Sequence, residues 1–261
     1  KEPVIDMPTR FVDFMRVLVP MAGDDTTPEG EQVNIYGNHV GSWNFAATAY
    51  LNRWKVKIYY EHYFDDHSQM FFQYGRWKDG HIGLEITFPK NRFIDTFVYE
   101  GLGTKDQTGP MLYDSFWGEF EEQISAKDNY YNHYLYQGWQ HWGMGIGNPL
   151  LPGPIYNKNG QITFISNRVL AHHIGFCGSP CQSLSYRMLL SYSRHWGTYD
   201  NPLNEIKKQF NSLFEVTYAP QQLKGWSFTV SGAMDRGSML GNNYGGMLVI
   251  RKQGIIKSGN K

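Results

Sequence analysis

Apolar and polar residues alternate along many short segments of this chain. Residues 54–62 read WKVKIYYEH, and residues 183–194 and 226–236 alternate in the same way. A period of two places successive side chains on opposite faces of a sheet. The pattern predicts nine β-strands, most of them 8–10 residues long, at 43–51, 54–62, 81–88, 92–100, 169–177, 183–194, 211–219, 226–236 and 244–252.

One face of nearly every predicted strand is apolar, whereas the other carries charge. A dry protein interior would not tolerate these charges unpaired, so we expect the charged face to meet water. We predict that the apolar face meets lipid through Val56, Ile58, Leu84, Ile86, Leu190, Val216, Val230 and Ile250. We predict that the polar face lines a lumen through Lys57, Glu85, Arg187, Glu215, Thr229 and Arg251.

The joins between the predicted strands alternate in length. Short joins are expected at 52–53, 89–91, 178–182 and 220–225, and longer joins at 63–80, 101–168, 195–210 and 237–243. Outer-membrane barrels combine short periplasmic turns with long extracellular loops, and their strands need about 9–11 residues. The sequence therefore predicts an all-β fold, an antiparallel transmembrane β-barrel or the C-terminal part of one, with a few short helices.

A soluble β-sandwich or barrel with one solvated face is the alternative, because antiparallel sheets commonly alternate in this way. Nine is an odd number of strands, whereas single-chain bacterial barrels use even numbers. Either one strand escapes the pattern, or the chain lacks the rest of the barrel.

The chain is predicted to form a single domain over residues 1–261. Residues 1–34 are a lead-in, with a short helix within 5–18 and a loop at 23–32. Residues 101–160 contain several glycines and prolines that break regular strands, so they are expected to leave the sheet. We predict that this excursion lies on the extracellular side and folds over or into the barrel mouth as a plug.

Composition narrows the possible function classes. The 24 basic and 24 acidic residues balance, so there is no electrostatic footprint for nucleic acid. Aromatic residues make up 16 % of the chain and there are 28 glycines, which favours an all-β chain with many turns. The sequence contains no run of 18 apolar residues, so no transmembrane helix is predicted. The first residues contain no signal peptide, so an exported protein would be represented here in mature or truncated form.

Aromatic and amide side chains are concentrated in residues 128–149, DNYYNHYLYQGWQHWGMGIGNP. Flat rings stack on the C–H faces of sugars, and amides and imidazoles bind hydroxyl groups. A packed plug or an aromatic girdle is the alternative explanation, because cores and membrane interfaces also collect Tyr and Trp. The predicted glycan-binding residues are Tyr131, Asn132, His133, Trp139, Gln140, His141 and Trp142.

The histidines and carboxylates of the chain are weaker indications of a metal site or of catalysis. The segment EHYFDDH at 61–67 suits metal binding or acid–base work, but a solvated loop explains it as well, and we predict neither a metal nor a cofactor. A glycosidase with two catalytic carboxylates is an alternative function, for which the candidates are Glu61, Asp65, Asp66, Asp128 and Asp200.

Two further residue types, histidine and cysteine, are candidate ligands. His172 and His173 are adjacent in a predicted strand, so they should point to opposite faces and cannot chelate together. Cys177 and Cys181 flank a predicted turn, where a small disulfide and free thiols are both possible.

Several stretches resemble the capsule assembly Wzi family as found in Bacteroidetes-type bacteria, from about residue 35 to near the end of the chain. They are GNHVGSWNFA at 37–46, YYEHYFDDHSQMFFQYG at 59–75, TFPKNRF at 87–93, DNYYNHYLYQGWQHWGMGIGNPLL at 128–151, YNKNGQITF at 156–164, SRHWGTYDNPL at 193–203 and LKGWSFTVSGAMDRGSMLGNNYGGMLVIRK at 223–252. Members of this family are longer, so the resemblance implies that this chain is their C-terminal part.

The resemblance also implies a function. Proteins of this family are outer-membrane barrels that help to attach or organise capsular polysaccharide at the cell surface, as lectins and not as enzymes. The expected partners are therefore a surface polysaccharide and outer-membrane lipid. The alternatives are a secreted or periplasmic carbohydrate-active enzyme with a soluble β-fold, or a general porin.

Overall fold

The computed structural model describes residues 9–19, 21, 23–27, 36–65, 70, 72, 78–91, 93–110, 127–133 and 138–254. In these ranges the chain forms nine long strands, one small hairpin, one α-helix and one 3-10 turn. The long strands are β1 (Val40–Leu51), β2 (Trp54–Asp65), β3 (Gly80–Thr87), β4 (Thr96–Gly103), β7 (Val169–Cys181), β8 (Leu184–Gly197), β9 (Pro202–Tyr218), β10 (Trp226–Gly237) and β11 (Asn243–Lys252). The remaining elements are α1 (Phe11–Leu18), β5 (Gln140–His141), β6 (Met144–Gly145) and the 3-10 turn η2 (Pro154–Tyr156).

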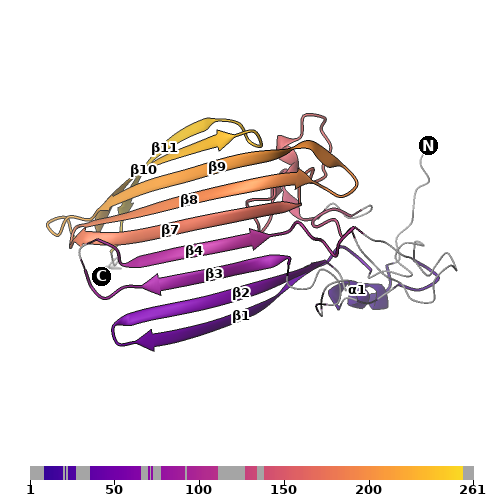
Figure 1. Cartoon of the computed structure of the whole chain (residues 1–261), viewed down its shortest axis with the longest axis horizontal. Coiled ribbons are helices and arrows are strands. Elements are labelled where there is room, and N and C mark those ends of the chain that lie inside the picture. The colour runs from indigo at the N-terminus through magenta and orange to yellow at the C-terminus, as the bar shows by residue number, and fades with distance from the viewer. Residues whose placement is uncertain are drawn as a thin grey trace, which may run out of the picture.

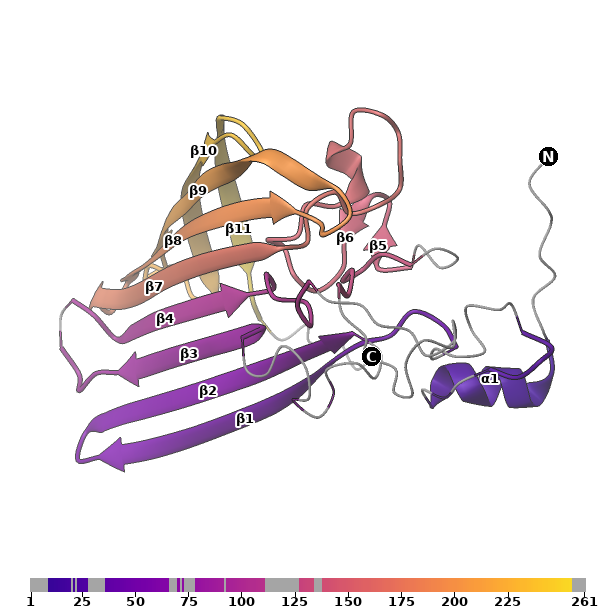
Figure 2. The same ribbon diagram turned by 45° about the vertical axis from the view of Figure 1, so that its right-hand side comes forward.

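The nine long strands form one antiparallel sheet in the order β1-β2-β3-β4-β7-β8-β9-β10-β11 (Figure 1). Each strand pairs with the next one along the chain, and β4 pairs with β7 across the 104–168 join. The sheet curls so that β10 and β11 turn behind β8 and β9 (Figure 2). Among the described residues, β1 and β11 are the two edges and do not pair with each other. The predicted all-β antiparallel fold and the nine strands are thus confirmed.

The strand registers confirm the predicted division of residues between the two faces. Lys57 pairs with Glu85, whereas the next residue, Ile58, pairs with Leu84. Further along the sheet, Arg187 pairs with Glu215, and Val230 pairs with both Val216 and Leu248. Followed from strand to strand, all residues predicted to face lipid share one side of the sheet, and all those predicted to face a lumen share the other. We call these sides the apolar face and the polar face.

The joins fall into two sets at opposite ends of the sheet, as the sequence predicts, but their lengths need a correction. At one end lie the joins at 52–53, 88–95, 182–183 and 219–225, which we call the short-join end. The other end, the long-join end, carries the joins at 66–79, 104–168, 198–201 and 238–242. The last of these was predicted to be long but is shorter than the joins at 88–95 and 219–225, so only the first two are long.

The predicted long join at 195–210 is wrong, because β8 runs to Gly197 and β9 begins at Pro202. Both strands extend beyond their neighbours, and a left-handed glycine, Gly197, with φ +86°, closes the turn between them. The predicted turn at 178–182 is also misplaced, because β7 continues through a bulge to Cys181.

The helix predicted within residues 5–18 is observed from Phe11 to Leu18, beyond the long-join end of β1 (Figures 1 and 2). Its Asp13 carboxylate accepts the Arg10 backbone N–H at 3.0 Å and so closes the first turn. Phe11 and Leu18 are exposed. Pro8, expected at the start of this helix, lies outside the described residues. In the described part of the chain, no helix has the length and apolar character needed to cross a membrane.

The buried apolar core is small and lies at the long-join end. The 127–168 segment packs there against the starts of β7 and its neighbours, on the polar face. The buried members of this core are Tyr131, Leu151 and Phe164 from the segment, and Val169 and Ala171 from β7. The excursion predicted to fold over the sheet is thus packed against the polar face over its described residues. In contrast, the apolar face leaves large side chains exposed, such as Val230 at 62 % and Leu248 at 64 %.

Candidate functional site

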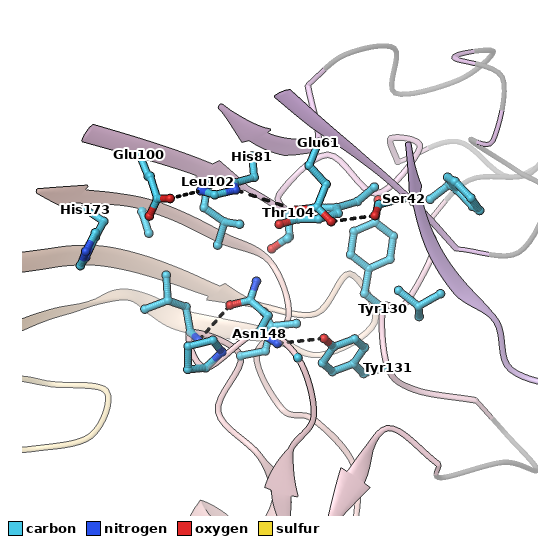
Figure 3. Close-up of a pocket in the computed structure, with 18 of the residues that line it drawn as sticks. Ser42, Glu61, His81, Glu100, Leu102, Thr104, Tyr130, Tyr131, Asn148 and His173 are labelled. Carbon is cyan, nitrogen blue, oxygen red and sulfur yellow. Dashed lines mark hydrogen bonds and ion pairs between the residues drawn. The ribbon is translucent and has the colours of Figure 1, made fainter. Parts of the chain in front are cut away.

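A cavity of about 720 Å³ lies on the polar face, between the sheet and the excursion. Strands β1 to β4, β7 and β8 supply one wall, and residues 147–151 with Tyr130 and Tyr131 supply the other (Figure 3). The wall from the sheet is polar because alternate residues of each strand point to this side. Rings and aliphatic groups from the excursion make the opposite wall more apolar.

Two carboxylates and a histidine form the polar centre of this wall. His81 lies between Glu61 and Glu100, with its Nδ1 3.8 Å from Glu61 Oε2 and its Nε2 3.5 Å from Glu100 Oε1 (Figure 3). Ser42 donates its hydroxyl to Glu61 at 2.6 Å, and the Tyr59 hydroxyl donates to Glu100. These interactions hold both carboxylates in place with further acceptor positions, which suits ligands rich in hydroxyl groups.

His173 extends this polar wall onto β7. It lies opposite Glu100 in the strand register, and its Nδ1 is 2.7 Å from the Ser191 hydroxyl. Its neighbour His172 points to the apolar face, where its Nδ1 is 2.8 Å from the Tyr99 hydroxyl. The prediction that these two histidines lie on opposite faces is confirmed.

A buried carboxylate fixes the excursion over the cavity. Asp79 accepts the backbone N–H groups of Asp106 and Gln107 at 2.8 and 2.7 Å, and the Tyr130 hydroxyl at 2.9 Å. Burial raises the pKa of the Asp79 carboxyl to about 6, although these hydrogen bonds favour its charged form. Burial also raises the pKa of Tyr130 well above its usual value, so this phenol remains a donor.

Two of the predicted binding residues form an aromatic stack within the excursion. Tyr131 is 8 % exposed, lines the cavity and accepts the Asn148 backbone N–H at 3.2 Å through its hydroxyl. Trp139 stacks on the Tyr131 ring with centroids 5.7 Å apart. Burial raises the pKa of Tyr131. Tyr131 therefore lines the cavity, whereas Trp139 does not line it and packs on the Tyr131 ring.

Asn132 and Gln140 use their amides to fix the backbone of the excursion. The Asn132 side chain both donates to Phe164 O and accepts from Phe164 N, at 2.9 and 2.8 Å. Gln140 accepts the Gly143 N–H at 2.7 Å. His133 lies beside Asn132 and is half-buried. None of these three residues lines the cavity.

His141 and Trp142 lie on a separate surface, the small hairpin formed by β5 and β6. Trp142 is 86 % exposed, and its ring contacts the edge of His141. Trp142 and Gly143 form the turn with φ values of +51° and +78°. Both central residues of a type I′ turn need positive φ, which normally selects Asn-Gly. A bulky ring at this position is strained, and such strain is typical of functional sites.

The sequence analysis missed His81 and Glu100, because no local motif connects them. They lie 19 residues apart and meet only through the register of β3 and β4. Among the carboxylates considered for a glycosidase, Glu61 lines the cavity, whereas Asp65, Asp128 and Asp200 do not. Asp66 lies outside the described residues.

The remaining candidate ligands are the two cysteines and the acidic and histidine side chains of the EHYFDDH segment. Cys177 and Cys181 are both free thiols. In the described ranges, no group of three or more His, Cys, Asp or Glu side chains is placed to hold a metal ion. His67, also in the EHYFDDH segment, is outside these ranges.

Comparison of the chain with models of protein families, with characterised proteins and with solved structures found no match.

Proposed function

We propose that this chain is part of an outer-membrane protein that binds capsular or another surface polysaccharide without cleaving it. The observation that carries the proposal is the difference between the two faces of the sheet. Glu61, Glu85, Glu100, Glu215 and Asp235 all lie on the polar face by register. None of the register-paired residues on the apolar face is Asp or Glu.

The apolar face supports contact with lipid. Near the long-join end Phe72 stacks on His62 and Met70 O accepts the Trp43 indole N–H, but the described residues leave most of this face uncovered. Contiguous exposed apolar surface of this kind is typical of membrane or protein interaction sites. Trp54 and Phe88 pack with centroids 5.0 Å apart near the short-join end, where an interfacial aromatic girdle would lie. A sheet in lipid must also pair its edges, so the proposal requires strand partners for β1 and β11.

The polar face and the excursion support the binding of sugars. The cavity has the size of a small-molecule site and combines aromatic rings with hydroxyl, carboxylate and imidazole groups. Trp142 adds an exposed ring on the β5–β6 hairpin, which lies at the long-join end of the sheet (Figure 2). A polysaccharide could stack on this ring while neighbouring residues enter the cavity, in keeping with the resemblance to the capsule assembly Wzi family.

Substitution of Trp142 tests this function directly. Trp142→Asn removes the ring but suits the positive φ of the turn, so the hairpin should be retained. Loss of one stacked ring costs about 1–1.5 kcal/mol, so affinity for the polysaccharide should fall about tenfold. The measurement is calorimetric titration of the detergent-solubilised protein with capsular polysaccharide from the source cells.

The matched control is Tyr244→Asn, which removes a similarly exposed ring from the apolar face. It should leave polysaccharide affinity unchanged. If wild type binds no polysaccharide, or both variants bind as well as wild type, the proposed site is wrong.

A glycoside hydrolase is the second candidate, because Glu61 and Glu100 line one cavity. Such enzymes place two carboxylates on opposite sides of the scissile bond. Here His81 occupies the space between them, which favours binding over hydrolysis. Release of reducing sugar by wild type, lost in both Glu61→Gln and Glu100→Gln, would establish the enzyme instead.

A further inference from the structure

The apolar face changes character close to the long-join end, where cations replace aliphatic side chains. Leu170 pairs with Arg194, and Arg194 pairs with Lys208, so the three side chains form one row across β7, β8 and β9. Arg236, opposite Phe210 on β10, continues the positive charge along this end.

Beyond this row the cations are held against aromatic rings. The Arg168 guanidinium lies 3.7 Å from the centroid of Tyr199, and Lys105 Nζ lies 4.7 Å from that of Trp196. Arg194 approaches the same Trp196 ring at 5.4 Å. We refer to Lys105, Arg168, Arg194, Trp196, Tyr199 and Lys208 as the rim cluster. Cations fixed over rings are already partly ordered, which lowers the cost of binding an anion.

The rim cluster borders a hollow of about 260 Å³, with Lys78, Lys105 and Arg168 among its lining residues. Two carboxylates also line it. Asp106 is 3.4 Å from Lys78, and Asp79 is buried beneath, hydrogen-bonded to backbone N–H groups and a phenol. With Arg194 and Lys208 beside it, the surface has an excess of positive charge.

We propose that the rim cluster binds the phosphate groups of lipid headgroups in the leaflet that surrounds the apolar face. This inference rests on the proposed function, which places that face in lipid. The step from Leu184 to Arg194 spans ten residues, about 34 Å along the strand, or about 26 Å of height at a tilt of about 40°, comparable with the apolar band of an outer-membrane barrel. The cluster therefore lies at the height of one headgroup layer.

The chemistry favours phosphate in particular. Arg168 and Arg194 offer planar forks of N–H donors that match phosphate oxygens, and Lys105 and Lys208 add point charges. The opposite, short-join end of the same face also holds a cation over a ring, with Lys252 Nζ 5.3 Å from the centroid of Trp226. Among the described strand residues of this face, however, that end has no arginine, and it carries further rings such as Trp54 and Tyr218. The two headgroup layers would thus meet different chemistry, with phosphate recognition on the side of the long joins.

Opposite faces of β8 and β9 provide a matched pair of variants. The double variant Arg194→Gln with Lys208→Gln removes two positive charges from the rim cluster. The control, Arg187→Gln with Lys207→Gln, removes the same two charges from the same strands, but on the polar face. Each protein is incorporated into phosphatidylcholine nanodiscs containing a minor fraction of diphosphoryl lipid A, and the lipid A retained after detergent exchange is quantified by mass spectrometry.

The rim variant should retain roughly tenfold less lipid A than wild type, whereas the control should match wild type. Lipid A without its phosphates should be retained poorly by all three proteins. Equal losses in both variants, no loss in either, or displacement of lipid A by equimolar inorganic phosphate would overturn the inference.

The polysaccharide titration separates this inference from the function on which it rests. If wild type enters nanodiscs and binds polysaccharide but retains no lipid A, only the rim site is wrong. If the rim variant loses polysaccharide in place of lipid A, the occupant is the polysaccharide and the lipid site is wrong. If wild type does not enter nanodiscs, the proposed function fails, and the rim site with it.

Discussion

Asp79 connects three parts of the chain through one buried carboxylate, so its titration should be visible in the stability of the fold. Its folded pKa of about 6 lies above the ordinary value of 3.8. Between these values the folded state holds a proton that the unfolded state has lost, so stability should fall as pH rises through this window. The expected contribution of Asp79 to the slope is on the order of 1 kcal/mol per pH unit, and this contribution should vanish above about pH 6.

Urea unfolding in detergent between pH 4 and 7, followed by tryptophan fluorescence, measures this slope. The free energy of unfolding of wild type minus that of Asp79→Asn isolates this contribution and should fall as pH rises through the window, whereas the same difference for Asp200→Asn, in an exposed turn, should not change with pH. An unchanged slope in Asp79→Asn would show that another group causes it.

At the scale of single strands, β10 offers the sharpest test of what the two faces contact. Val230 lies on the apolar face between Val216 and Leu248, and its neighbour Thr229 lies on the polar face, bonded to Thr217 at 2.8 Å. Arginine in the middle of a lipid-facing strand costs about 2–4 kcal/mol. Val230→Arg should therefore destabilise the protein in bilayers by this amount, and Thr229→Arg far less.

Folding titrations in phosphatidylcholine vesicles provide the two free energies. In water an exposed Val→Arg change costs little, since 62 % of Val230 is already accessible. Equal, small effects of the two substitutions would therefore exclude the lipid contact.

The strands and their faces were predictable because a period of two is a property of the local sequence. The ends of β8 and β9 could not be predicted in this way. Residues 195–210 contain Gly197 and Pro202, which favour a loop when read locally, but both strands extend because they pair with each other beyond the rest of the sheet. Register depends on pairing between distant segments, so the meeting of His81 with Glu100 could not be predicted from either strand alone.

At the scale of the whole molecule, the two ends of the sheet should face different compartments. Lys158 is exposed within the excursion at the long-join end, and Gln222 is exposed in a short join. With Cys177 and Cys181 replaced by serine, a cysteine at Lys158 should react with a membrane-impermeant maleimide in intact cells. A cysteine at Gln222 should react only after the outer membrane is permeabilised. The reverse pattern would invert the proposed topology.

The aromatic segment shows where sequence reasoning about the candidate site stops. Its composition indicates ring-rich binding or packing, and the structure contains both arrangements. Tyr131 and Trp139 stack in or beside the core, whereas Trp142 projects from a hairpin. The difference depends on the turn at Trp142 and Gly143 and on contacts with Phe164, which lies far along the chain.

The strand order also determines the direction of the two edges. Neighbouring strands of this sheet run in opposite directions, so the first and last of nine, β1 and β11, run the same way. If these edges met directly, their seam would be parallel, with slanted hydrogen bonds between otherwise antiparallel ladders. A closed wall made only of antiparallel pairs would instead need an odd number of strands inserted between them. A second copy related by a two-fold axis along the barrel would not remove the mismatch, because its β1 would run in the same direction.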